Sequence, residues 1–76
     1  MMSIVIDAWN EYSRAARDFP PFTSAHEGYA ILLEEVDELW DEVKKNPRER
    51  DYDKMRREAI RVAAMALRFV KDVCDK

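Results

Sequence analysis

The sequence has few of the residues that staple or interrupt a small protein: one cysteine, one glycine and three prolines among 76 residues. A single cysteine excludes a disulfide within the chain, and Cys74 is interpreted as a small apolar residue of a helix rather than a nucleophile. This cysteine usage, with no signal-peptide pattern, favours a reducing, cytoplasmic compartment. So few helix breakers, combined with 38% charged residues, predict an all-α chain.

Long apolar runs and an excess of positive charge are lacking too. No run approaches the roughly 20 apolar residues of a membrane helix, so we expect no membrane partner. The net charge is -3, with acidic and basic residues mixed along the chain, which leaves no basic stripe for a nucleic-acid polymer. The length predicts a single domain (1–76), which is marginally stable alone because so short a chain buries only about 60% of its unfolded surface.

Apolar residues recur at helical spacing in three segments. The first predicted helix covers Ser3–Arg17 and ends before the two prolines of "DFPPF". The second begins after Ser24, which forms a capping box with a glutamate three residues later, and runs to about Lys45. The third covers roughly Asp53–Val73. The connection before it is either an open loop or contains a short turn started by Pro47.

The second predicted helix carries one apolar stripe and two acidic flanks. The stripe, which we expect to be core, consists of Tyr29, Leu32, Leu33, Val36, Leu39, Trp40 and Val43. One flank holds Glu34, Asp37 and Asp41, and the other holds Glu35, Glu38 and Glu42. Carboxylates at this spacing repel by about a few tenths of a kcal/mol per pair, which a solvated surface tolerates. On this helix alone, a solvated face is the simpler interpretation.

The apolar arc of the third predicted helix is too wide for three short helices to cover. It spans roughly 220° of the circumference, whereas a surface helix shows a stripe of about 100° or somewhat more. We therefore predict a three-helix subunit that forms a four-helix-bundle-type core through homo-oligomerisation. The small residues that would let helices approach closely are Ala59, Ala63, Ala64 and Ala66.

Glu58 projects from the apolar side of this third helix. A carboxylate there should be paired, raised in pKa or bound to a metal, unless the first turn frays and Glu58 escapes to water near the helix N-terminus. The alternative is that Glu58 faces Glu35 and Glu38 across a gap between helices. Carboxylates brought together in this way need a cation, and an all-oxygen set suits Mg²⁺ or Mn²⁺.

The last two predicted helices resemble a known family. "LLEEVDELWDEV" and "REAIRVAAMALRFVKDV" are similar to the paired helices of the MazG-like, all-α nucleoside triphosphate pyrophosphohydrolases, which carry Glu-x-x-Glu on one helix and Glu-x-x-Asp on the next. Glu35 and Glu38 match the first motif, and Glu34 supplies the doubled glutamate that often opens it. Glu58 starts the second motif after nineteen residues. The resemblance covers about Ser24 to Asp72.

The resemblance implies a dimer or tetramer that hydrolyses a nucleotide between its α and β phosphates, releasing a monophosphate and pyrophosphate. It implies Mg²⁺, or Mn²⁺, held by Glu35, Glu38 and Glu58, with Glu34, Glu35 and Glu38 as catalytic residues. Such an ion neutralises phosphate oxygens and lowers the pKa of a bound water. Glu34 or Glu42 would be a further ligand or would orient this water. The candidate substrate-binding residues are Trp9, loosely placed to stack on a base, and Lys44, Lys45, Arg57 and Arg61 for phosphates.

Arg61 departs from the family pattern, because it stands where the family has the aspartate of Glu-x-x-Asp. The metal could stay on three glutamates and water, or Arg61 could replace a metal and bind phosphate. Alternatively, Arg61 pairs with Glu58 or Glu35 and the site is inactive. The chain would then be a nucleotide-binding relative without hydrolysis, or a helical interaction module. Glutamates do not select a base, so the sequence does not predict which nucleotide binds.

Overall fold

The computed structural model describes residues 1–76 and contains helices but no strands. The elements are α1 (Met2–Asp18), α2 (Ala25–Val43), the 3-10 turn η1 (Pro47–Glu49), α3 (Tyr52–Phe69) and the π-helical turn η2 (Val70–Cys74). The predicted all-α class is confirmed. The bounds of α1 and α2 differ from the predicted ones by at most two residues, whereas α3 ends at Phe69, four residues before the predicted Val73, and continues as η2. A short turn does form at Pro47. None of the helices combines the length and the apolar character that a membrane crossing requires.

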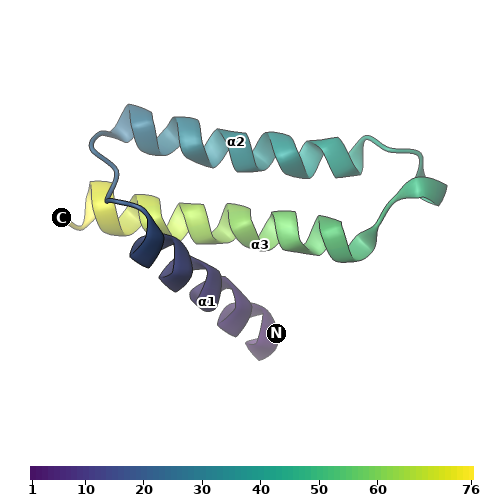
Figure 1. Ribbon diagram of the computed structural model, residues 1–76, viewed down its shortest axis with the longest axis horizontal. Helices are drawn as coiled ribbons and strands as arrows, with labels where there is room; N and C mark the ends of the chain where they lie inside the picture. Colours follow the sequence, from purple (N-terminus) through teal and green to yellow (C-terminus); the bar gives the residue numbers. More distant parts are fainter.

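Helix α3 is the element on which the other two pack. Figure 1 shows α2 and α3 side by side and antiparallel, while α1 crosses α3 obliquely and diverges from α2 toward the N-terminus. The antiparallel arrangement follows from the connection 44–51, which is too short to do more than reverse the chain. It brings the first half of α3 opposite the second half of α2, and this pairing places the site described below.

Side-chain caps fix where α2 and α3 begin. The Ser24 hydroxyl accepts a hydrogen bond from the Glu27 backbone N–H at 3.0 Å. The Glu27 carboxylate reaches back to Thr23, accepting from its backbone N–H at 2.9 Å and from its hydroxyl at 3.1 Å. This is the predicted capping box displaced by one residue, with Thr23 replacing Ser24 as the second donor. At α3, the Asp51 carboxylate accepts from the backbone N–H groups of Asp53 and Lys54.

The buried core is small and lies where the three helices meet. It consists of Ala15, Phe22, Ala64 and Met65, with Tyr12, Ile31, Leu32, Phe69 and Val73 packed against it. The segment "DFPPF" contributes Phe22, which turns inward, whereas Phe19 stays exposed. With so few buried apolar side chains, the single chain has little hydrophobic stabilisation of its own.

The apolar stripe of α2 is only partly core within one chain, which corrects the sequence-based expectation. Leu32, Leu39 and Val43 are half-buried against α3, but Tyr29, Leu33, Val36 and Trp40 are exposed, Trp40 by 57%. The physical reason is that α3 covers the side of α2 that carries Leu32, Leu39 and Val43. No other part of the chain covers the side that carries the four exposed residues.

The exposed apolar residues of α2 and α3 form one surface, called here the open face. Its members are Tyr29, Leu33, Val36 and Trp40 of α2, and Ala59, Ala63, Ala66, Leu67 and Val70 of α3. All of these positions except Leu67 directly follow a residue on the side where α2 and α3 meet, and Leu67 lies one helical turn from Ala63 and Val70 of the same face. Because the helices are antiparallel and each residue advances about 100°, both sets rotate to the same side of the pair. Helix α1 packs on the opposite side.

Gly28 lies where α2 comes closest to two aromatic rings. A Cβ added to Gly28 would lie 2.8 Å from Cδ2 of Phe69 and 3.0 Å from Cδ2 of Phe22. We expect Gly28→Ala to lower the free energy of unfolding by about 1 kcal/mol or more in urea denaturation, because overpacking costs roughly 1–3 kcal/mol and outweighs the gain in helix propensity.

The matched control is Ala30→Gly at an exposed position of the same helix, which reports the propensity difference of about 1 kcal/mol alone. A Gly28→Ala variant more stable than the parent would show that the two rings do not approach Gly28 this closely.

Candidate metal and nucleotide site

Three glutamates converge between α2 and α3. Carboxylate oxygens of Glu35, Glu38 and Glu58 all lie within 4.8 Å of one another. Glu35 and Glu38 are three residues apart and share one side of α2, while Glu58 lies in the second turn of α3. The structure therefore brings together the three residues that the sequence suggested as metal ligands. Their role as ligands stays a prediction. We call these residues the glutamate triad.

The triad is partly withdrawn from water. Glu58 is only 7% exposed, so the interpretation that it escapes to solvent from a frayed first turn is wrong. Oε2 of Glu58 and Oε2 of Glu35 are both buried without a hydrogen-bond partner in the chain. Glu38 is exposed, so one side of the triad is open. Buried carboxylate oxygens without a donor are costly, and a bound proton or a positive group would relieve this cost.

Burial and crowding hold protons on the triad. Burial, and after it the neighbouring Glu38 carboxylate, raises the pKa of Glu35 from its ordinary value of 4.5 to about 7. Burial likewise raises the pKa of Glu58, although the nearby Arg61 guanidinium opposes the change. Near neutral pH the triad therefore binds a proton that a divalent cation would displace.

Arg61 contacts the triad, but its guanidinium is paired with only one of the three carboxylates. Its Nη1 donates to Oε1 of Glu58 at 3.3 Å, which is long for a hydrogen bond between charged groups. No ion pair joins Arg61 to Glu35 within 4.0 Å. The predicted pairing with Glu58 is thus present and the one with Glu35 is absent, and both orphaned oxygens remain.

Other residues proposed from the sequence lie outside the triad. Glu42 is buried and binds Lys45 at 2.9 Å and Lys54 at 3.4 Å. Lys45 lowers the pKa of this carboxylate, so Glu42 is a structural anchor between α2 and α3 and not a free ligand. Lys44 is paired with Asp41 at 3.0 Å. Lys44 and Lys45 are therefore both paired with acidic side chains that follow the triad residues of α2 in the sequence.

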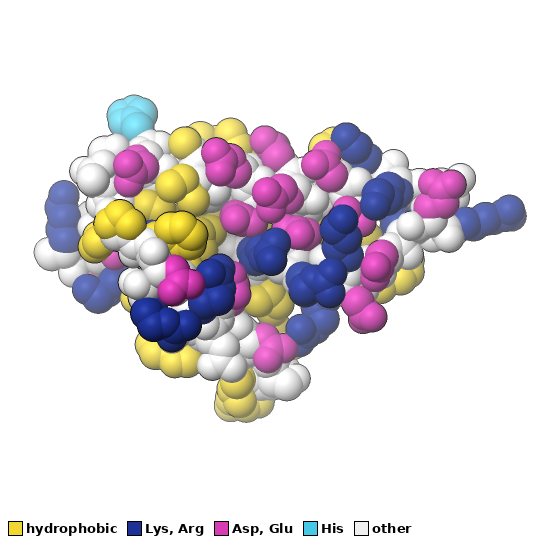
Figure 2. Space-filling model, viewed as in Figure 1, with side chains coloured by type: hydrophobic (Ala, Val, Ile, Leu, Met, Phe, Trp, Pro, Cys, Tyr) yellow, Lys and Arg dark blue, Asp and Glu magenta, His cyan; other side chains and the backbone are white.

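Trp9 and Arg57 are placed differently. Trp9 stacks on Tyr12 with ring centroids 5.2 Å apart and remains 60% exposed. Arg57 makes no ion pair and lines a hollow of about 390 Å³ between α1 and α3, together with Arg14, Arg56 and Arg61. Figure 2 shows how charge is distributed over one face of the molecule: acidic side chains gather over α2 and basic ones over α3.

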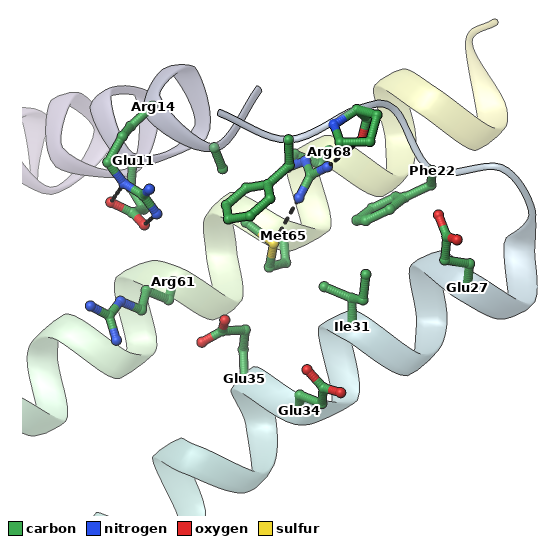
Figure 3. Close-up of a pocket in the computed structure, with 13 residues that line it drawn as sticks. Glu11, Arg14, Phe22, Glu27, Ile31, Glu34, Glu35, Arg61, Met65 and Arg68 are labelled. Carbon is green, nitrogen blue, oxygen red and sulfur yellow. Dashed lines mark hydrogen bonds and ion pairs between the residues drawn. The ribbon is translucent and has the colours of Figure 1, made fainter. Parts of the chain in front are cut away.

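A second hollow, called here the central pocket, adjoins the triad and has a volume of about 470 Å³. It lies between all three helices and the segment that joins α1 to α2, and its lining includes Glu34, Glu35, Arg61 and Arg68 (Figure 3). The sequence interpretation missed Arg68. The available signal was its spacing: Arg68 follows Ala64 by four residues and Arg61 by seven, which puts it on the side of α3 that meets α1.

No protein-family model matches the chain, and no curated protein or solved structure matches it either. The resemblance to the MazG-like enzymes therefore rests on the motifs of α2 and α3 alone.

The raised pKa of Glu35 predicts a stability that depends on pH. Because its pKa is higher in the folded chain, the folded state binds more protons, and this stabilisation is complete below about pH 4.5 and lost as the pH rises through about 7. In chelator, the free energy of unfolding should increase on going from pH 8 to pH 5, by at most about 3 kcal/mol. Glu35→Gln should reduce this slope in urea denaturation, and Glu58, whose pKa is also raised, maintains the remainder.

The control is Glu34→Gln, which removes an exposed neighbouring carboxylate and should retain the slope. Glu11 and Glu42, whose pKa values are lowered, act in the opposite sense but only near and below pH 4.5. An unchanged slope in Glu35→Gln would contradict the assignment.

Proposed function

We propose that the protein is a metal-dependent nucleoside triphosphate pyrophosphohydrolase of MazG-like type, which releases a nucleoside monophosphate and pyrophosphate. The observation that carries the proposal is the glutamate triad, with two buried carboxylate oxygens that no protein donor satisfies. The adjoining pocket of about 470 Å³ is in the size range of small-molecule sites. The motif resemblance supplies the reaction, and the triad and pocket support it.

The donor set fits Mg²⁺ or Mn²⁺. Both ions prefer oxygen ligands. The triad oxygens lie within 4.8 Å of one another, so one ion could contact all three after the side chains move closer together. The exposure of Glu38 leaves room for the waters that Mg²⁺ normally keeps. The missing family aspartate at Arg61 is therefore replaceable by water.

The residues of the site have different roles in the proposed reaction. Glu35, Glu38 and Glu58 hold the ion, which when bound supplies charge neutralisation of phosphate oxygens and an acidified water. Glu34 lines the adjoining pocket and makes no hydrogen bond or ion pair in the chain, so its carboxylate is free to contact the substrate. Arg61, whose contact with Glu58 is long, would turn its guanidinium to a phosphate, and the unpaired Arg57 would reach one from the neighbouring hollow between α1 and α3.

The open face supports homo-oligomerisation as part of the same proposal. A stable dimer needs about 800 Å² from each partner, a modest part of the 5580 Å² surface of this chain. The open face supplies large apolar side chains on α2 and three alanines beside Leu67 and Val70 on α3, a combination that permits close packing of helix pairs. A second copy packed there would complete a four-helix bundle and supply the core that one chain lacks.

One observation favours a second candidate function, a nucleotide-binding protein without hydrolysis. The contact of Arg61 with Glu58 already places a positive charge beside the triad. If this contact persists in the complex, the triad loses a ligand and the phosphates meet a guanidinium in place of a metal ion.

Pyrophosphate release from a panel of nucleoside triphosphates tests the enzyme directly. We expect release with Mg²⁺ or Mn²⁺ and none in chelator. Glu38→Gln should lower kcat by at least about 100-fold, because it keeps the shape and removes a ligand charge. The control Asp37→Asn removes an exposed carboxylate from the neighbouring position and should change kcat less than about threefold. Saturable binding without release from any substrate would favour the second candidate.

Sedimentation tests the proposed oligomer. Val36→Glu and Leu67→Glu each put a charge into the open face and should convert the oligomer to monomer, with a lower melting temperature, because a buried unpaired charge is costly. Val5→Glu, at an exposed apolar position of α1, is the control and should leave the oligomer intact. A parent protein that sediments as a monomer at all concentrations would contradict the proposal.

A further inference from the structure

The central pocket has an end that the proposed phosphate chemistry does not use. Figure 3 places Glu35 and Arg61 at one end of the pocket and Arg68 with Phe22 at the other. Apolar side chains line the space between them, including Ile31 from α2. A nucleotide whose phosphates lie at the glutamate triad would therefore extend its base toward Arg68.

Arg68 is a buried cation without an anion. Arg68 is only 4% exposed, and its guanidinium makes no ion pair with any carboxylate within 4.0 Å. Nη2 donates to the Pro20 carbonyl oxygen at 3.0 Å, Nη1 makes only a weak contact with Sδ of Met65 at 3.6 Å, and Nε has no partner.

The guanidinium of Arg68 is held in place while much of its donor capacity stays unused. Its central carbon lies 4.3 Å from the centre of the Phe22 ring, an arrangement that fixes the plane of the group. A guanidinium carries five N–H donors, and the chain provides one strong acceptor. Burying such a group is costly unless acceptors complete it. Because Arg68 lines the pocket, a ligand there can supply an acceptor to the part of the guanidinium that faces it.

We propose that the central pocket binds a guanine base, with Arg68 as the residue that selects it. This inference rests on the proposed function for the position of the phosphates. Guanine presents two adjacent acceptors, O6 and N7, which match the fork of a guanidinium, whereas adenine places an N6 amino donor beside N7. The ring stacks among the apolar side chains of the pocket, a mode that any base shares.

The opposite wall of the pocket complements the other edge of guanine. Glu34 lines the pocket from α2 and makes no hydrogen bond or ion pair in the chain. A carboxylate accepts hydrogen bonds from N1–H and the N2 amino group, the two donors of the guanine edge. Adenine lacks both donors there. The pocket thus offers donors and acceptors in the pattern that guanine requires.

The test is a comparison of GMP, IMP and AMP, titrated in the presence of Mg²⁺ and followed by NMR of the folded protein. The three ligands carry the same phosphate, so affinity differences report the base. We expect GMP and IMP, which share O6 and N7, to bind roughly 5- to 150-fold more tightly than AMP. AMP binding as tightly as GMP, or no saturable GMP binding, would overturn the inference.

Variants identify the residue responsible. Arg68→Lys keeps the charge but loses the fork, so the preference for GMP over AMP should fall to less than about threefold. Arg14→Lys changes another pocket arginine, which is already paired with Glu11 and Asp18, and should keep the preference. If Arg68→Lys fails to fold, the comparison of ligands on the parent protein still decides the inference.

The outcomes separate this inference from the proposed function. Preferential GMP binding without pyrophosphate release from GTP would leave the guanine pocket standing and overturn the enzyme. Metal-dependent release at equal rates from GTP and ATP, with no preference among the monophosphates, would leave the enzyme standing and overturn the guanine pocket.

Discussion

Mutual repulsion among three carboxylates between α2 and α3 is the constraint around which the chain is arranged. Glu35, Glu38 and Glu58 share a space that is partly closed to water, and folding places them there although each would be better solvated outside. The chain offsets this cost incompletely, by retaining a proton and by bringing Arg61 to one edge. Two buried oxygens remain without a donor from another side chain, and these are the atoms that the proposed metal ion would satisfy.

The elements that the sequence predicted well are those set by local chemistry. The prolines after Asp18, the Ser24 cap and the 3.6-residue period are sufficient to place three helices, while the turn at Pro47 was one of two alternatives. The convergence of the triad was also predictable, because an antiparallel pair with a short connection leaves little choice of register. Periodicity could not predict which part of an apolar arc is covered by other helices of the same chain. Trp40 and Leu32 belong to the same stripe, yet only Leu32 is covered by α3.

Arg68 shows why the remainder of the site was not predictable. On a helical wheel it is a charged residue at the edge of an apolar arc, where long side chains normally reach water. Its burial depends on the segment "DFPPF", whose Pro20 carbonyl and Phe22 ring enclose the guanidinium. The same segment is tied to the C-terminal end, since the Phe22 backbone N–H donates to the Asp72 carboxylate at 3.1 Å, fifty residues away. Contacts of this range arise from tertiary structure and leave no periodic trace in the sequence.

The open face and the central pocket lie on opposite sides of the α2–α3 pair, because α1 forms one wall of the pocket and packs away from the open face. A two-fold dimer closed through the open face would therefore turn both pockets outward. Assembly and ligand entry would then use separate surfaces, and neither would obstruct the other. Diluting such a protein to monomers would lower its folding stability without closing the entrance to either pocket. Each subunit would carry a complete set of ligand contacts.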